Sequence, residues 1–207
     1  QLQYHCEASL FRVLHKGIEN KLITFNRKDF LNQKIPGSIL FVKTDFVLGG
    51  LYALIEALKN IDRKIILTIV GPAKEHHEML ENLLVKAHIP FELFDYVQPV
   101  ELLKKMQQSQ IFCVPSKREA FGLANLEAMA MGCKIVTTNV GGIPEALNGD
   151  RFAWLVKDDD PVSLRNALNE ALDTSIEKDL NDITDHLNHF SSTKVISRFK
   201  EILEECF

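Results

Sequence analysis

The most informative stretch of the sequence is Ile111–Leu147, IFCVPSKREAFGLANLEAMAMGCKIVTTNVGGIPEAL. It holds two short apolar runs, Ile111–Val114 and Lys134–Thr138, separated by a segment with helical character. Short runs rich in Ile, Val and Phe are typical of strands buried on both faces. The stretch therefore predicts a strand, a helix and a parallel strand joined by a right-handed crossover.

The same alternation continues on both sides of this stretch. Further strands are predicted at Ile39–Val42, Lys64–Val70, Phe91–Tyr96 and Phe152–Val156. Helices are predicted at Gly50–Asn60, Lys74–Ala87, Val100–Gln108, Gly122–Met131 and Val162–Leu172, the last with Asp160-Pro161 at its start. Pro36-Gly37 is expected to precede the first strand. The pattern indicates an α/β fold, a doubly wound parallel sheet of the Rossmann-like class.

The ends of the chain follow a different pattern. Ser9–Lys16 is predicted to be helical, and a polar link, Asn26–Ser38, leads to the first strand. Thr193–Cys206 is predicted to be an amphipathic helix with Phe199 and Leu203 on its apolar face. Such an apolar face is expected to pack against another surface, either a further domain or the flank of this domain.

Composition excludes several classes of protein. The 207 residues are 46% hydrophobic and 25% charged, with a net charge of −4, which gives no support for nucleic-acid binding. No apolar run reaches the roughly 18–20 residues of a transmembrane helix. Gln1–Glu7 does not resemble a signal peptide, and the first residue suggests a start inside a longer protein. The four scattered cysteines, Cys6, Cys113, Cys133 and Cys206, are expected to be free thiols of a cytoplasmic protein.

No metal site is expected from the sequence. His76 and His77 are adjacent, so on a helix their side chains diverge by about 100° and make poor co-ligands. Asp158–Asp160 is interpreted as a solvated loop and helix cap.

The ligand-binding site is expected at the carboxyl ends of the strands, where ligands bind in open parallel sheets. Pro115–Ala120 follows a strand at that edge, and a helix starts near Phe121-Gly122. The first amides of a helix lack intrahelical partners and lie at the positive end of its dipole. The segment therefore predicts a phosphate site.

Glu119 and Glu127 flank this predicted phosphate site, seven residues apart. A carboxylate accepts two hydrogen bonds side by side, which suits vicinal hydroxyls such as those of a ribose or a hexose. Glu127 could instead be only a favourable charge near the helix dipole. Gly141-Gly142 could be only a turn.

The segment resembles the retaining glycosyltransferases of family 4, which have the GT-B fold. Glu119 and Glu127 match the E-x7-E signature of that family. The neighbouring motifs fall in the family's order: Pro115-Ser116, Phe121-Gly122-Leu123, Glu127-Ala128-Met129, Gly132 and Gly141-Gly142-Ile143-Pro144-Glu145. The resemblance implies a C-terminal half of such an enzyme, with residues 1–36 as an interdomain helix and linker, 37–188 as the nucleotide-sugar-binding domain and 189–207 as a helix returning towards an N-terminal domain.

The resemblance also implies a role for each site residue. Glu119 would contact the transferred sugar and Glu127 the ribose. The backbone amides of Phe121, Gly122 and Leu123 would hold the diphosphate, and the base would lie near Tyr96 and Val97. No cofactor is implied: the donor would be a UDP-sugar or a GDP-sugar. The acceptor, a glycan or lipid, would bind the N-terminal domain, through which the whole protein could contact the inner face of a membrane.

One departure from the family pattern concerns positive charge. Members usually carry an Arg just after the first strand and a Lys a few residues later, and these positions hold Thr44 and Gly49 here. Lys43 is the nearest cation, but if the strand is regular its side chain would point the opposite way from that of residue 44. A local bulge could turn Lys43 inward, Lys117 or Arg118 could supply the charge, or the domain could bind weakly. We predict the first of these outcomes.

Two other functions compete with glycosyl transfer. A degenerate, non-catalytic domain of the same fold, binding a partner, stays open because of Thr44 and Gly49. A two-carboxylate glycoside hydrolase is disfavoured, because such enzymes need an acid with a raised pKa and helix amides are expected to lower carboxylate pKa values.

Overall fold

The chain folds around one six-stranded parallel sheet, seen in a computed structural model that describes residues 12–25, 27–157, 160–175 and 179–206. The strand order is β3-β2-β1-β4-β5-β6, and each neighbouring pair is parallel. The strands are β1 (Ile35–Val42), β2 (Ile66–Val70), β3 (Phe91–Phe94), β4 (Ser109–Val114), β5 (Lys134–Thr138) and β6 (Ala153–Val156). The predicted α/β, Rossmann-like class is confirmed.

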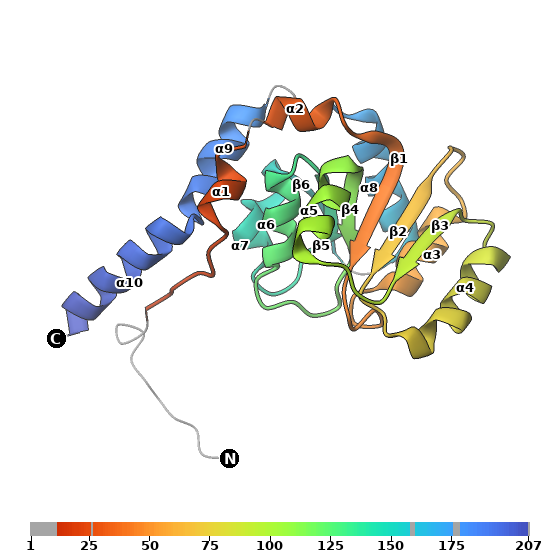
Figure 1. Cartoon of the computed structure of the whole chain (residues 1–207), viewed down its shortest axis with the longest axis horizontal. Helices are drawn as coiled ribbons and strands as arrows, with labels where there is room; N and C mark the ends of the chain where they lie inside the picture. The colour runs from red at the N-terminus through yellow and green to blue at the C-terminus, as the bar shows by residue number, and fades with distance from the viewer. Residues whose placement is uncertain (1–11, 26, 158–159, 176–178, 207) are drawn as a thin grey trace, which may run out of the picture.

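Helices cover both faces of the sheet (Figure 1). On one side α3 packs against α8, and on the other α5, α6 and α9 pack together. The α-helices are α1 (Asn20–Ile23), α2 (Arg27–Leu31), α3 (Leu51–Leu58), α4 (His77–Lys86), α5 (Pro99–Gln108), α6 (Leu123–Ala130), α7 (Ile143–Leu147), α8 (Pro161–Asp173), α9 (Leu180–His189) and α10 (Ser192–Cys206). Single 3₁₀ turns lie at η2 (Lys74–His76) and η3 (Gly149–Arg151).

The core forms where the sequence is most continuously apolar. Phe41 on β1 and Phe112 on β4 are completely buried, because the central strands have helices on both faces. Asp160 caps α8 as predicted: its carboxylate accepts a hydrogen bond from the Ser163 amide at 2.7 Å, and Pro161 occupies the first helical position. Cys113 and Cys133 are buried free thiols, while the expectation for Cys6 and Cys206 stays a prediction.

Three predictions about the N-terminal part are wrong. Residues 12–17 are not helical, and Ser9–Phe11 lie outside the described residues. The link Asn26–Ser38 contains α2 and the start of β1, because Phe30 is buried in the core and the Arg27 guanidinium bonds the Thr184 hydroxyl at 2.6 Å. Pro36-Gly37 lies inside β1, where a register irregularity between Ile35 and Ile39 accommodates it.

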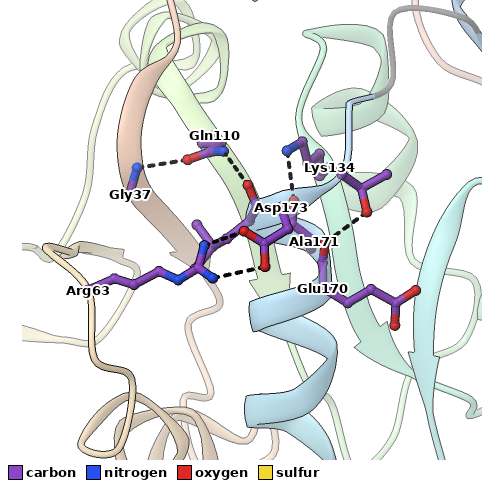
Figure 2. Close-up of polar contacts among 9 residues, drawn as sticks. Gly37, Arg63, Gln110, Lys134, Glu170, Ala171 and Asp173 are labelled. Carbon is purple, nitrogen blue, oxygen red and sulfur yellow. Dashed lines mark hydrogen bonds and ion pairs between the residues drawn. The ribbon is translucent and has the colours of Figure 1, made fainter.

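Side chains at the amino edge of the sheet cap the end of α8 (Figure 2). The Lys134 ammonium donates to the Ala171 carbonyl at 2.7 Å, and the Gln110 amide donates to the Leu172 carbonyl at 3.4 Å. Arg63 holds Asp173 with two hydrogen bonds of 2.6 and 2.8 Å. The bonds from Lys134 and Gln110 satisfy helix carbonyls near the end of α8, and the Arg63–Asp173 pair ties that end to the chain before β2, so this edge is a structural one.

The first and last described segments meet beside the sheet. Ile18 pairs with Ser191 in an isolated parallel bridge, and Arg12 forms an ion pair with Glu205 at 2.8 Å. From there α10 runs away from the sheet (Figure 1). None of the described helices has the length and apolar character needed to span a bilayer.

Candidate functional site

Three loops meet at the carboxyl edge of the sheet. They follow β1 (residues 43–50), β4 (115–122) and β5 (139–142). The Lys117 amide donates to the Leu48 carbonyl at 2.8 Å, and the Gly142 amide donates to the Ala120 carbonyl at 3.0 Å. These backbone bonds fix the position of the loop that carries Glu119.

Gly141 allows two of these loops to touch. Its φ is +54°, and a Cβ built on it would lie 1.7 Å from the Glu119 carbonyl oxygen. A side chain at this position would therefore push the Glu119 loop away. The pair Gly141-Gly142 is thus more than a turn, because it sets how closely the Glu119 loop approaches β5.

Lys43 and Glu119 form an ion pair at this edge. The Lys43 ammonium donates to Glu119 Oε2 at 2.6 Å, and their side chains are 27% and 23% exposed. The other oxygen, Oε1, accepts from the Ala120 amide at 3.0 Å. Partial burial acts to raise the pKa of Glu119, but Lys43 and the amides of Ala120 and Phe121 outweigh it and lower that pKa. Glu119 is therefore ionised near neutral pH.

Lys43 faces the site for a reason other than the expected bulge. β1 ends at Val42, so Lys43 lies beyond the alternation of the strand. Its stem occupies the space beside Gly49: a Cβ built on Gly49 would lie 2.9 Å from Lys43 Cγ. Gly49, where the resemblance leads one to expect a lysine, thus leaves room for the stem of Lys43.

A small cavity of about 220 Å³ lies beside this ion pair. Its lining includes Lys43, Ser116, Glu119, Gly122, Leu123 and Asn125. Asn125 is 4% exposed, and its Oδ1 has no hydrogen-bond partner among the described residues. A buried amide oxygen without a partner is uncommon in folded proteins. Sequence reasoning missed Asn125, although its place as the polar residue within Leu123–Leu126 was a signal for it.

The first turn of α6 borders the same cavity. Gly122 is its N-cap in a left-handed conformation, and Leu123 begins the helix. The Phe121 amide, which is expected to hold the diphosphate, helps to hold the Glu119 carboxylate in this structure. The Phe121 ring turns away from the cavity and stacks on His15, with 5.3 Å between ring centroids.

Glu127 does not line this cavity. It is half-buried on α6, and burial, followed by repulsion from Glu19, raises its pKa. The expectation that helix amides lower both carboxylate pKa values is therefore wrong for Glu127, because Glu127 lies beyond the first turn, where the dipole effect has faded. Glu119 and Glu127 consequently differ in protonation behaviour.

Tyr96 and Val97 lie away from the cavity as well. They follow β3, which is an edge strand of the sheet. β2 lies between β3 and β1. Tyr96 is 66% exposed and Val97 is half-buried. Among the sequence-predicted site residues, the structure brings together Lys43, Glu119, Gly122 and Leu123, and leaves Glu127, Tyr96 and Val97 outside the cavity.

A larger cavity of about 640 Å³ lies elsewhere, along β6 between α8 and α9. It contains none of the predicted site residues, and it does not lie at the loops after β1 and β4. The smaller cavity is the better candidate because it joins a cation, a carboxylate and a helix N-terminus. Within the described part of the chain, no three His, Cys, Asp or Glu side chains gather as metal ligands.

Residues 23–185 match the family model described as glycosyl transferases group 1. The chain belongs to this family. It is 27% identical over 196 residues to an uncharacterised glycosyltransferase of Methanocaldococcus jannaschii, covering 93% of this chain and 53% of that one. It is 36% identical over 99 residues to a D-inositol 3-phosphate glycosyltransferase of Corynebacterium diphtheriae, covering 48% of this chain and 23% of that one. The chain thus spans about half the length, or less, of these curated relatives.

Solved structures share the fold. A glycosyltransferase from Rickettsia africae superposes with a TM-score of 0.79 at 19% identity, covering 96% of this chain and 58% of that one. Anabaena HepE, solved in complex with UDP-glucose, gives a TM-score of 0.74 at 17% identity, again covering 96% and 58%. The sheet is therefore that of a GT-B glycosyltransferase domain.

Proposed function

We propose that this chain is the donor-binding half of a retaining glycosyltransferase that moves a hexose from a nucleoside diphosphate to a glycan or lipid acceptor. The observation that carries the proposal is the Lys43–Glu119 pair beside the first turn of α6. A cation and the first amides of a helix, which have no intrahelical acceptor, suit a diphosphate, and a carboxylate suits sugar hydroxyls. A UDP-sugar or a GDP-sugar is the expected donor, and the HepE complex with UDP-glucose supports the first.

Each site residue has a proposed role. Glu119 accepts hydrogen bonds from the hexose, while Lys43 and the amides of Gly122 and Leu123 bind the diphosphate. Lys43 then stabilises the negative charge that builds on the leaving diphosphate. Glu127 contacts the ribose.

The base is proposed to extend towards Tyr96 and Val97. Neighbouring strands lie about 4.8 Å apart, so the end of β3 is on the order of 10 Å from the end of β1. An extended nucleotide spans that distance along the edge of the sheet, and the exposed Tyr96 ring offers a surface for stacking.

The acceptor is proposed to bind a second domain of a longer protein. The GT-B neighbours support this, because this chain covers 58% of the Rickettsia africae structure. We therefore expect the 207-residue chain to bind a nucleotide without transferring sugar. A non-catalytic binding domain is the second candidate, favoured by Thr44 and Gly49 at the positions of the usual cations.

Titration of the chain with UDP and with GDP tests the proposal. We expect a dissociation constant in the millimolar range or tighter for one of them, and no affinity for either would refute donor binding. Sugar transfer to an acceptor by this chain alone would contradict its assignment as one half of the enzyme.

Alanine variants of the two carboxylates test their roles. Glu127→Ala should weaken both the nucleotide and the nucleotide-hexose, because the ribose is common to both. Glu119→Ala should lower the affinity for the nucleotide-hexose relative to the affinity for the nucleotide, because only the nucleotide-hexose loses a contact with Glu119. Each lost contact should cost about 1.5–3 kcal/mol. Glu81→Ala, at an exposed position on α4, serves as the control. Equal losses for both ligands in both variants would refute the roles.

A further inference from the structure

Two groups that the proposed function assigns to different parts of the donor bind each other in the structure. The Lys43 ammonium, assigned to the diphosphate, lies 2.6 Å from Glu119 Oε2, assigned to the hexose. The diphosphate and the Glu119 carboxylate are both anions, so they compete for one ammonium group. The ion pair therefore affects which ligand the site holds.

Neither partner is easily replaced. Less than a quarter of the Glu119 side chain is exposed, so a Glu119 carboxylate without its cation would be poorly hydrated. The Lys43 stem is held over Gly49, with Cβ and Cγ 3.0 and 2.9 Å from the place of a Cβ on that residue. Moving the ammonium to a phosphate thus leaves Glu119 in need of other hydrogen bonds.

We propose that Glu119 distinguishes the intact donor from the spent nucleoside diphosphate by competing for Lys43. When the nucleotide-hexose binds, the hexose hydroxyls hydrogen-bond Glu119, and Lys43 turns to the diphosphate. Once the hexose has moved to the acceptor, Glu119 has lost these hydroxyls and takes Lys43 back. The diphosphate then loses its counter-charge and dissociates more readily. This inference rests on the proposed function and adds a specificity role to the same site.

A double-mutant cycle with Glu119→Gln and Lys43→Met tests the competition. Ligand-detected NMR measures the affinity of all four proteins for UDP, for GDP and for the matching nucleotide-hexose. Gln removes the charge but keeps an oxygen for the Ala120 amide, which donates to Glu119 at 3.0 Å. Glu119→Ala serves as a second neutral variant, and circular dichroism checks that every variant is folded.

The expected result is a gain in nucleoside diphosphate affinity that depends on Lys43. Any anion near the phosphates repels them, so Glu119→Gln improves binding somewhat in both backgrounds. Where Lys43 is present, the gain should be larger by a further factor of about five or more, because Gln also frees the ammonium. The parent should prefer the nucleotide-hexose, and Glu119→Gln should reverse that preference.

Two contrary results have different meanings. If Glu119→Gln gives the same gain with and without Lys43, within about twofold, the ammonium serves both anions at once. The competition is then overturned, while the measured binding leaves the proposed function standing. If neither UDP nor GDP binds any of the four proteins, the proposed function itself fails.

Discussion

At the scale of single residues, the site depends on an exchange between positions 43 and 49. Thr44 and Gly49 stand where the resemblance leads one to expect cations, and Lys43 places a positive charge beside Glu119 from a neighbouring position. The exchange works because the strand ends before Lys43 and because Gly49 has no side chain. Position 49 is therefore coupled sterically to the ion pair.

We predict that Gly49→Ala damages both stability and the ion pair. The new methyl group would lie 2.8 Å from Phe41 Cζ and 2.9 Å from Lys43 Cγ. Overpacking of this kind costs about 1–3 kcal/mol, and urea unfolding would measure it. Nucleoside diphosphate affinity should fall as well, because Lys43 is displaced. A Gly49→Ala protein that unfolds and binds like the parent would contradict this steric coupling.

Replacing Asn125 with an apolar residue should raise the stability of the protein and lower its affinity for the nucleotide-hexose. Its Oδ1 is buried with no hydrogen-bond partner in the described part of the chain, which costs free energy of folding. Asn125→Leu, of similar size, should raise the free energy of unfolding by about 1 kcal/mol. Because the amide lines the cavity beside Glu119, the same change should weaken nucleotide-hexose binding. Loss of stability on this substitution would show that Asn125 has a structural partner.

At the scale of elements, the contact between α7 and α9 should make the stability of the protein fall in mild acid. The ring of His186 on α9 hydrogen-bonds the Ala146 carbonyl at 2.7 Å and lies near the rings of Phe152 and Phe190. Burial lowers the pKa of His186, and the bond to Ala146 only partly offsets this. The unfolded chain thus binds the proton more readily than the folded one, so stability falls as the pH drops below the unfolded value of about 6.5.

We predict that His186→Gln flattens this pH dependence. Gln keeps an N–H for the Ala146 carbonyl but does not titrate. Melting temperatures of the parent and the variant between pH 7.5 and 5 would measure the difference, with His76→Gln, outside this junction, as the control. Parallel melting curves for the parent and His186→Gln would remove His186 as the source.

The sequence predicted the central elements well and the flanking ones poorly. β5 matches its predicted bounds because a short apolar run marks it, and α5 matches within one residue because its apolar residues recur at helical spacing. The short helices α1 and α2 were missed, since tertiary burial of residues such as Phe30 holds them rather than local propensity. In the site, motif spacing identified Glu119 and Gly122, but the direction of Lys43 depends on where β1 ends and on packing over Gly49.

At the scale of the whole molecule, α10 carries an apolar face that the described residues leave exposed. Ile196, Phe199 and Leu203 are 55%, 47% and 42% exposed. We expect this face to pack against a further domain of a longer protein, because the chain spans about half the length of its relatives.

Phe199→Asp tests this packing. In the 207-residue chain it should leave the melting temperature unchanged, since the side chain is half exposed. In the longer protein it should lower the melting temperature and speed proteolysis between the domains. Lys200→Asp, at a neighbouring exposed position, controls for added charge. Unchanged behaviour of the longer protein would argue against docking of α10.

The placement of β1 at the centre of the sheet affects how the chain folds while it is being synthesised. Its partner β4 joins it through pairs such as Ile39 with Ile111, which lie far apart in the sequence. At about 5–20 residues per second, the ribosome needs on the order of 4–15 seconds to make the intervening chain. During that time one edge of β1 has unpaired amides and carbonyls, so the nascent chain is open to misassociation and to chaperones. Protease resistance of stalled nascent chains should therefore rise sharply only after β4 has left the exit tunnel.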